Sequence, residues 1–155
     1  MVSIRMAQKE DMSQVLKLIH ELAIFEKQPN AVEITLEDLE DHGFGAQSRF
    51  KCFVAEDKNI VGMALVYERY STWKGPAIHL EDLIVRKSYR GRGIGSLLLE
   101  RVIGYAKERN VRRLGWEVLD WNTSAIKFYE SKGARILTEW RVVQMDESAL
   151  ANYEG

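Results

Sequence analysis

The feature that most constrains this sequence is an apolar segment followed by a glycine-rich loop and an amphipathic segment. Residues 77–85 are mostly apolar, as expected of a strand that is buried on both faces. Gly91, Gly93 and Gly95 alternate in the next stretch, and apolar residues then recur at helical spacing as far as Asn110. This order predicts a strand, loop and helix unit with a right-handed crossover to a parallel strand.

The glycine loop is typical of a phosphate site, and a simple tight turn is the alternative. Alternating glycines let the backbone approach a ligand closely. The first N–H groups of the following helix lack partners inside the helix and favour negative charge, and Arg90 and Arg92 add cationic donors. No P-loop run is present, and Ser96 stands where the dinucleotide fingerprint has its third glycine. Neither of those nucleotide folds is expected.

Patterns elsewhere predict the remaining helices and strands. Alternation or apolar runs predict strands at residues 2–6, 50–56, 60–70, 114–119 and 140–145, with a hairpin between the second and third of these. Helical spacing predicts helices at residues 11–27, 35–43 and 123–132, the second with a cap at Thr35 and Asp38. The expected fold class is α/β, with a mixed six- to seven-stranded sheet and helices on both faces, in a single domain of residues 1–155.

Composition fits a soluble protein of ordinary globular type. A chain of 155 residues with 46% hydrophobic content can bury a core without disulfides, and Cys52 has no second cysteine to pair with. Apolar runs fall short of the ~20 residues of a membrane span, and the N-terminus lacks a signal-peptide pattern. We therefore expect a cytoplasmic protein with no membrane partner. His20, His42 and His79 lack metal-ligand spacing, so no metal is expected.

Charge is unevenly distributed along the chain, although the net charge is −1. Residues 1–50 contain five basic and nine acidic side chains, whereas residues 86–113 contain nine basic and two acidic ones. The first stretch suits a cationic ligand and the second an anionic one. The basic residues surround a helix start and lack a known DNA- or RNA-binding motif, so no nucleic-acid partner is expected.

Arg90, Gly93 and Gly95 after an apolar strand, followed by Asn122 and then Tyr129, resemble the GNAT superfamily of acetyl-CoA-dependent N-acetyltransferases. The resemblance extends over nearly the whole chain. It is closest to the diamine group of spermidine/spermine and thialysine acetyltransferases. The closer match is carried by LAIFE (22–26), DHGFG (41–45), YSTWKG (70–75), LED (80–82), YRGRGIGS (89–96) and LDWN (119–122). Residues 71–75 and 119–122 look more like the thialysine branch.

The resemblance implies acetyl-CoA as cosubstrate, bound between two splayed parallel central strands, and a homodimer with residues 140–145 as a candidate interface. The implied acetyl-CoA contacts are Leu83, Ile84, Val85, Arg90, Gly91, Arg92, Gly93, Ile94, Gly95, Ser96, Asn122, Ser124, Ala125, Tyr129 and Lys132.

Acetyl transfer to an amine requires a base and a hydrogen-bond donor. A primary ammonium, with a reference pKa of ~10.4, must lose a proton, and the departing thiolate benefits from a donor. Tyr129 is the candidate donor because it shares a helix face with Ala125. An aromatic core role beside Phe128 is the alternative.

Two carboxylates, Glu81 and Asp82, interrupt the apolar strand, and buried carboxylates are costly unless they are paired or used. Neighbours on a strand face opposite sides, so we expect these two to point apart. The resemblance assigns the position of Glu81 to substrate binding and to drawing the amine proton through water; pairing with an arginine is the alternative. Asp82, Phe25, Glu26 and Trp73 are further candidate substrate contacts.

The sequence therefore predicts an N-acetyltransferase that transfers acetyl directly to a small diamine, polyamine or lysine-like amine. A covalent acetyl-enzyme is not expected, because Cys52 has no evident base. One alternative is a protein amino group as acceptor. The other is a non-catalytic acetyl-CoA-binding module, against which the presence of both Tyr129 and Glu81 argues.

Overall fold

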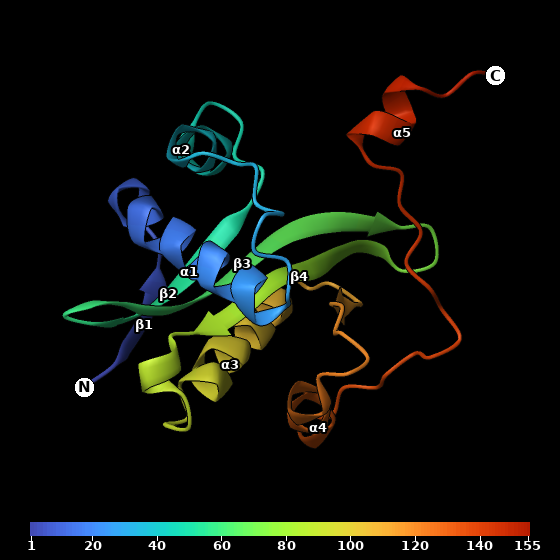
Figure 1. Cartoon of the computed structure of the whole chain (residues 1–155). Helices are drawn as coiled ribbons and strands as arrows, with labels where there is room; N and C mark the ends of the chain where they lie inside the picture. The colour runs from blue at the N-terminus through green and yellow to red at the C-terminus, as the bar shows by residue number, and fades with distance from the viewer. The chain divides into compact units, whose positions relative to one another are not determined.

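The computed structural model describes residues 1–155 as two compact units, Met1–Glu117 and Val118–Gly155, which are described separately (Figure 1). The first unit contains β1 (Ser3–Met6), η1 (Lys9–Asp11), α1 (Met12–Phe25), α2 (Leu36–Phe44), β2 (Lys51–Asp57), β3 (Asn59–Ser71), β4 (Gly75–Val85), η2 (Lys87–Tyr89), α3 (Ile94–Glu108) and β5 (Leu114–Gly115). The second contains α4 (Thr123–Ser131) and α5 (Glu147–Ala151). The single domain expected from the sequence stays a prediction.

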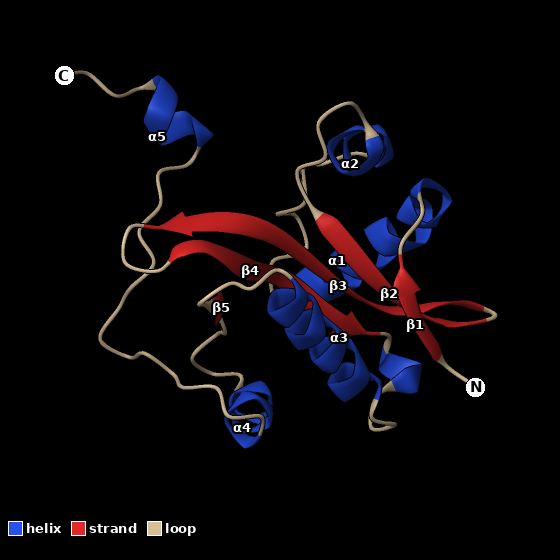
Figure 2. Cartoon of the chain, turned by 180° about the vertical axis from the view of Figure 1, so that it is seen from behind, coloured by secondary structure: helices blue, strands red, loops and turns tan.

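The sheet belongs to the first unit and has five strands in the order β1-β2-β3-β4-β5 (Figure 2). The first four strands pair antiparallel, and β5 pairs parallel to β4. This confirms the mixed α/β class and the β2–β3 hairpin. The crossover from β4 to β5 contains the glycine loop and α3, as the strand, loop and helix pattern predicted.

The number of strands is smaller than the predicted six to seven. The strand expected at residues 114–119 is reduced to Leu114–Gly115, and the strand expected at residues 140–145 does not form. Extended residues make a strand only when their backbone groups pair with a neighbouring strand. Trp140 N–H donates instead to Leu137 O at 3.4 Å, within the same loop. Alternating apolar residues were therefore insufficient evidence of a strand.

Helix boundaries follow the local signals more closely. The predicted cap is present at α2, where Thr35 Oγ1 accepts a hydrogen bond from Asp38 N–H at 3.1 Å and Thr35 N–H donates to the Asp38 carboxylate at 2.9 Å. The short helix α5 was not predicted. It begins where Asp146 Oδ1 accepts a hydrogen bond from Ala149 N–H at 2.8 Å.

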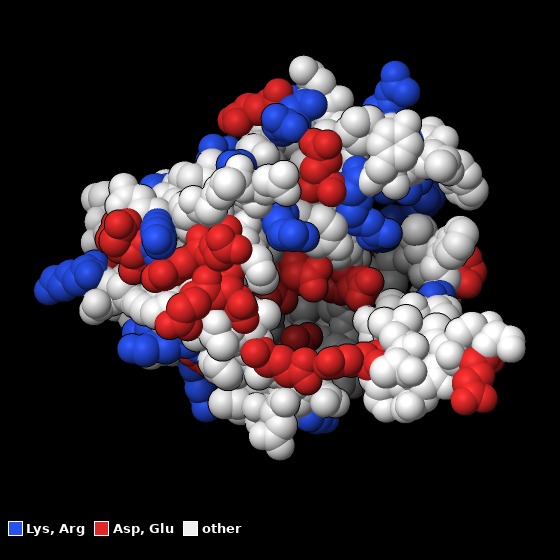
Figure 3. Space-filling model, turned by 90° about the horizontal axis from the view of Figure 1, so that it is seen from above, with Lys and Arg blue, Asp and Glu red and all other residues white.

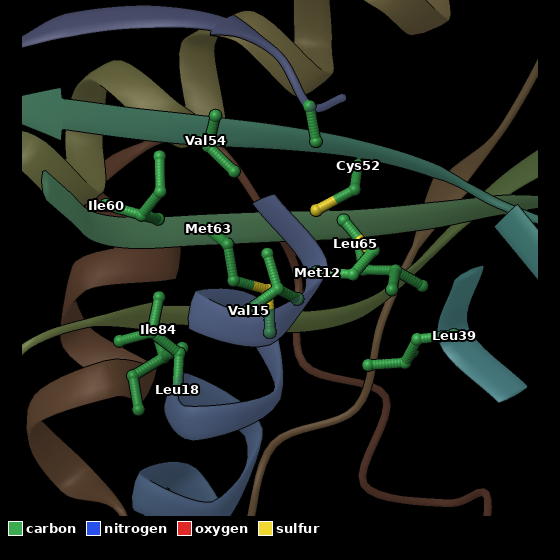
Figure 4. Packing of buried hydrophobic residues seen from close by; sticks show 11 residues of the cluster. Met12, Val15, Leu18, Leu39, Cys52, Val54, Ile60, Met63, Leu65 and Ile84 are labelled. Atoms are coloured by element: carbon green, nitrogen blue, oxygen red, sulfur yellow. The ribbon is translucent and has the colours of Figure 1, made fainter. Parts of the chain in front are cut away.

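Helices cover both faces of the sheet, as predicted. On one face, Val15 and Leu18 of α1 are fully buried in a cluster with Met63 of β3 (Figure 4). On the other, the ring of Phe53 meets Tyr105 of α3 with ring centroids 5.5 Å apart. Each fully buried side chain of this size stabilises the fold by about 1.5–3 kcal/mol.

Acidic side chains gather on one face of the structure (Figure 3). Helix α2 contains four acidic residues, Glu37, Asp38, Glu40 and Asp41. The basic residues 86–113 instead surround η2 and α3. The acidic and basic segments of the sequence therefore lie on different elements of the fold.

Arg5 links three segments near the N-terminus. Its Nη1 donates to Asp11 Oδ2 at 2.7 Å and its Nε donates to Glu56 Oε2 at 2.9 Å, which joins β1 to η1 and β2. The hydrogen bond from Arg5 lowers the pKa of the buried Asp11 carboxyl. Both carboxylates are therefore stabilised in their charged form.

We predict that Arg5→Met lowers the free energy of unfolding at pH 7 by about 2 kcal/mol, because Asp11 would be left buried without its charged donor. Urea denaturation measures this change. The matched control is Arg109→Met, since Arg109 pairs with Glu68 at 2.8 Å but both side chains are half exposed, and little change is expected. Equal losses in the two variants would contradict the special role of Arg5.

Candidate functional site

A β-bulge in β4 sets the direction of the acidic side chains in this apolar strand. The β3–β4 register pairs Leu65 with Asp82 and Val66 with Leu80, which leaves Glu81 without a cross-strand partner. A bulge of this kind breaks the two-residue alternation of side chains. The expectation that Glu81 and Asp82 point to opposite faces is therefore wrong.

Both Glu81 and Asp82 face the side of the sheet that α1 covers. Asp82 pairs with Leu65 of the core cluster. Glu81 Oε2 lies 3.6 Å from Nε2 of His79, whose cross-strand partner is Tyr67. Leu65 and Tyr67 are two residues apart on β3 and so share a face. The bulge thus brings two neighbouring carboxylates to one surface.

Glu26, the C-cap residue of α1, adds a third carboxylate. Burial raises the pKa of Asp82 from 3.8 to about 6, and the negative charges of Glu81 and Glu26 act in the same direction. Burial also raises the pKa of Glu26. A carboxylate with a pKa near 6 is ionised at pH 7 and still basic enough to accept a proton. This carboxylate cluster of Glu26, Glu81 and Asp82 suits a cationic ligand.

Two aromatic residues were predicted to contact the same ligand. Phe25, the last residue of α1, lies beside the cluster, with the guanidinium of Arg90 5.3 Å from its ring centroid. Trp73 lies in the β3–β4 turn and is 76% exposed. The β4 residues from Gly75 to Glu81 span about 20 Å, since a strand rises ~3.3 Å per residue. The structure therefore does not bring Trp73 to the carboxylate cluster.

The glycine loop enters α3 through two residues with left-handed backbone conformation. Gly91 has a φ of +75° and Gly93 of +78°, where a side chain costs about 1–2 kcal/mol. A Cβ at either position would have no other heavy atom within 4 Å, so the loop presents an open backbone surface. Gly93 is the N-cap of α3 and has no side chain to accept from the first turn. The N–H groups of Ile94, Gly95 and Ser96 therefore suit an anion.

Arg90 holds this loop to the end of β4. Its Nε donates to Val85 O at 2.8 Å, and its guanidinium lies 3.8 Å from Glu21 Oε1. Glu21 Oε1 also accepts a hydrogen bond from Lys87 N–H at 2.9 Å. These contacts fix where the loop leaves the strand, a role for Arg90 that the sequence did not indicate.

The parallel pair of β4 and β5 is short. Cross-strand partners are only Ile78 with Leu114 and His79 with Gly115. Residues 80–85 of β4 therefore have no partner strand on that edge, which agrees with the expectation of splayed parallel strands.

Backbone groups of Leu83 and Val85 point toward this unpaired edge. Arg86 N–H donates to Val61 O of β3 at 2.7 Å. Alternate residues of an antiparallel strand direct their N–H and C=O groups to opposite neighbours, so Ile84 shares the orientation of Arg86. Because Val85 O already accepts from the loop, the groups left for a ligand are Val85 N–H and both groups of Leu83.

The second unit contains the remaining predicted site residues, on or beside α4: Asn122, Ser124, Ala125, Tyr129 and Lys132. Asn122 Oδ1 accepts a hydrogen bond from Ala125 N–H at 3.3 Å and so caps the helix. The rings of Phe128 and Tyr129 have centroids 5.4 Å apart, and Lys132 Nζ lies 5.9 Å from the Phe128 ring centroid. Ala125 and Tyr129 share a face of α4, as their spacing predicted.

Burial raises the pKa of the Cys52 thiol to about 12, so the thiol stays protonated at neutral pH. Cys52 is 3% exposed, which agrees with the expectation that it is not the nucleophile of a covalent acetyl-enzyme. No group of three or more His, Cys, Asp or Glu side chains is arranged to hold a metal ion. None of the helices is both long enough and apolar enough to span a membrane.

Sequence reasoning missed three supporting residues, Glu21, Tyr89 and Arg69. The Tyr89 hydroxyl donates a hydrogen bond to Asp57 Oδ2 at 3.3 Å, and the guanidinium of Arg92 lies 4.8 Å from the centroid of the Tyr89 ring. The contact of Tyr89 with Asp57 joins segments 32 residues apart in sequence, so no local pattern signals it. The bulge did leave a signal, since two successive acidic residues interrupt the apolar sequence of β4.

Known proteins resemble this chain over most of its length. The model of the acetyltransferase (GNAT) family matches residues 14–134. A thialysine N-epsilon-acetyltransferase of Bos taurus is 39% identical over 99% of this chain and 98% of that protein. The human spermidine/spermine N(1)-acetyltransferase-like protein 1 is 34% identical over 95% of this chain and 23% of its own length.

Solved structures share the fold. An integron cassette protein from the mobile metagenome of V. cholerae superposes with a TM-score of 0.78 at 27% identity, covering 97% of this chain and 95% of that one. An aminoglycoside acetyltransferase from an uncultured soil sample has a TM-score of 0.77 at 20% identity, covering 94% and 97%. The family match spans the glycine loop, the carboxylates of β4 and α4. The protein is thus an acetyl-transferring enzyme, and the chain belongs to the GNAT family of acetyltransferases.

Proposed function

We propose that this enzyme transfers the acetyl group of acetyl-CoA to the primary amine of a small diamine, polyamine or lysine- or thialysine-like substrate. The observation that carries the proposal is the carboxylate cluster, which combines three negative side chains at the end of α1 and the bulge of β4. Such a cluster attracts a cationic amine and disfavours an anionic acceptor. The thialysine N-epsilon-acetyltransferases at 36–39% identity support an amino-acid-like amine.

Acetyl-CoA is assigned to the backbone surfaces at the end of β4. The N–H groups of Ile94, Gly95 and Ser96 suit its pyrophosphate. The unpaired groups of Leu83 and Val85 suit the amides of a pantetheine arm, which would add to the edge as a strand does. The family resemblance further assigns contacts to Ile84, Asn122, Ser124, Ala125 and Lys132. The bound thioester supplies an acetyl group that an uncharged amine can attack.

The proton transfers are assigned to three side chains. Glu81 and Asp82 bind the ammonium, and Glu81 accepts its proton through water, because the side chain of Glu81 is 54% exposed. The hydroxyl of Tyr129 donates a hydrogen bond to the sulfur that leaves; a phenol with a reference pKa of ~10 is protonated at pH 7. Cys52, with a pKa of about 12, offers no thiolate to carry the acetyl group. Direct transfer between bound substrates is therefore favoured.

The proposal also includes a homodimer, as the family resemblance implies, and the cytoplasmic location expected from the composition. Trp140, Val142 and Val143 have exposed fractions of 66%, 60% and 90%, which suits a segment that a second copy covers. Phe25 remains a proposed acceptor contact beside the cluster, whereas Trp73, about 20 Å along β4 from Glu81, would contact only a part of the acceptor that extends beyond the cluster.

The function is tested by acetyl-CoA consumption, read as free thiol release, across spermidine, spermine, putrescine, lysine, thialysine and a lysine-containing peptide. Selective turnover of one small amine is the expected result. Turnover of the peptide alone would contradict the small-molecule assignment. Acetyl-CoA binding without turnover of any amine would contradict the cationic acceptor.

Gly93→Ala is predicted to weaken acetyl-CoA binding at least tenfold in isothermal titration calorimetry, because a methyl group would hold the pyrophosphate away from the N–H groups. The matched control is Gly75→Ala, since Gly75 has a φ of +79° and equally open space around its Cβ. Both variants should lose similar stability from backbone strain. Similar acetyl-CoA affinity in the two variants would exclude the loop as the pyrophosphate site.

Asp82→Asn is predicted to raise the stability of the protein at pH 8 while lowering turnover. The folded-state pKa of about 6 exceeds the ordinary value of 3.8, so the contribution of Asp82 to stability is fully present below pH ~4 and is lost as the pH rises through 6. Asparagine carries no charge and removes this pH-dependent loss of folding free energy, which is on the order of 2 kcal/mol. Urea denaturation at pH 5 and pH 8 measures the difference.

The control for this change is Asp38→Asn, which should have the opposite sign. The hydrogen bond from Thr35 N–H lowers the pKa of Asp38, so its charged form stabilises the fold at pH 8 and the variant should lose stability. Loss of stability at pH 8 in Asp82→Asn would show that Asp82 is a structural residue instead.

A further inference from the structure

His79 is a buried polar side chain that the proposed reaction does not use. Asp11 and His79 are the two buried polar or charged residues of the chain, and Asp11 is paired with Arg5. His79 is 6% exposed and lies on β4 two residues before Glu81, with its ring centroid 5.2 Å from that of Tyr67. Burying an imidazole is unfavourable unless its nitrogens find partners.

The partner of each ring nitrogen determines the position of the ring proton. Arg69 Nη1 lies 3.1 Å from His79 Nδ1. Because a guanidinium has only N–H donors, Nδ1 is the acceptor and the proton of the neutral ring is on Nε2. Glu81 Oε2 lies 3.6 Å from that Nε2, and a small rotation of the half-exposed Glu81 closes the gap to hydrogen-bond distance. Arg69 thus selects the tautomer in which His79 presents a donor to Glu81.

We propose that Arg69 and His79 position the Glu81 carboxylate for the acceptor amine. This inference rests on the proposed role of Glu81 in acetyl transfer. His79 holds Oε2 as a neutral donor and leaves Oε1 for the ammonium group. A guanidinium in direct contact would pair with the carboxylate and compete with a cationic amine. The imidazole ring keeps Arg69 away from Glu81 and still fixes the orientation of its carboxylate.

Charges on the neighbouring segments favour neutral His79. Burial lowers the pKa of His79 and the positive charge of Arg69 on β3 lowers it further, whereas Glu81 and Glu117 act in the opposite direction. Tyr67 on β3 is the other titratable group at the ring, and burial and the charge of Glu81 raise its pKa. At pH 7, His79 is therefore a hydrogen-bond donor rather than a cation.

Nuclear magnetic resonance reports the tautomer and the protonation of His79 and does not depend on enzyme activity. The chain has three histidines, so long-range ¹H–¹⁵N correlation spectra can resolve each ring, and His79→Gln assigns its signals. We expect a neutral ring protonated on Nε2 between pH 6 and 8. Arg69→Met should make His79 titrate at a higher pH. A proton on Nδ1, or an unchanged titration in Arg69→Met, would overturn the proposal.

Steady-state kinetics test whether His79 acts through Glu81. His79→Phe keeps a flat ring without the donor, and kcat/KM should fall roughly tenfold. His79→Gln, whose amide N–H reaches about the position of Nε2, should recover most of the loss. In the Glu81→Gln background, His79→Phe should add little, because the effects of coupled residues are not additive. An equal loss in both backgrounds would refute a role through Glu81.

The pH dependence of Arg69→Met provides an independent test on an exposed residue. With a higher pKa, more His79 is charged at pH 6, and the imidazolium pairs with Glu81 and competes with the amine. The ratio of KM for the amine, variant over wild type, should therefore be largest at pH 6 and fall to a smaller value, still above one, at pH 8.5, where only the tautomer selection by Arg69 is lost. Arg109→Met on the opposite face is the control, with a ratio near one throughout.

A KM ratio for Arg69→Met that does not change with pH contradicts the proposal that Arg69 acts on Glu81 through His79. If the wild-type enzyme acetylates no amine, the proposed function fails, and the resonance measurements still decide the tautomer of His79 and the effect of Arg69 on it.

Discussion

The register of β3 against β4 shifts by one residue at Glu81, and the geometry of the site depends on that shift. Before the bulge, Ile78 N–H donates across the β5 edge to Arg113 O at 3.0 Å. After it, Leu83 and Val85 point to the same edge. The bulge therefore changes which backbone groups face the unpaired edge as well as which side chains face α1. In a regular strand, Asp82 would point to the α3 side with Leu80, away from the other two carboxylates.

Because of this shift, one strand presents two different surfaces, each suited to one of the two proposed substrates, which carry opposite charges. Toward its C-terminal end, β4 presents backbone groups and leads into the N–H groups of α3, which suit the phosphates and amides of acetyl-CoA. At the bulge it presents carboxylates, which suit an ammonium group. Arg90 lies between the two regions, bonded to Val85 O and 3.8 Å from Glu21. This contact directs its positive charge toward α1 and leaves the open surface of the loop to backbone N–H groups.

Local signals predicted most of the fold and the glycine loop at the start of α3, where the pyrophosphate of acetyl-CoA is proposed to bind. The Thr35 cap, the β2–β3 hairpin and the strand, loop and helix unit follow from residues close in sequence, where the physical causes are local. The bulge, the Arg90 contacts and the environment of His79 depend on pairing between distant segments, which a sequence pattern does not specify. The prediction of a strand at residues 140–145 was wrong for the same reason. Alternating apolar residues indicate which side chains would share a face of a strand, but they do not show whether another strand pairs with it.

Two groups of carboxylates in this chain differ in the sign of their pKa shifts, and the sign separates their roles. At the N-terminus, hydrogen bonds from Arg5 lower the pKa values of Asp11 and Glu56, so the charged forms stabilise the fold. At the bulge, burial raises the pKa values of Asp82 and Glu26, so their charged forms oppose folding. Carboxylates with only a structural role would be stabilised by pairing with an arginine. Arg90 contacts the ring of Phe25, next to Glu26, and Arg69 contacts His79, two residues before Glu81. Their charges are instead directed to Glu21 and His79, which leaves the negative charge of the cluster for a cationic substrate.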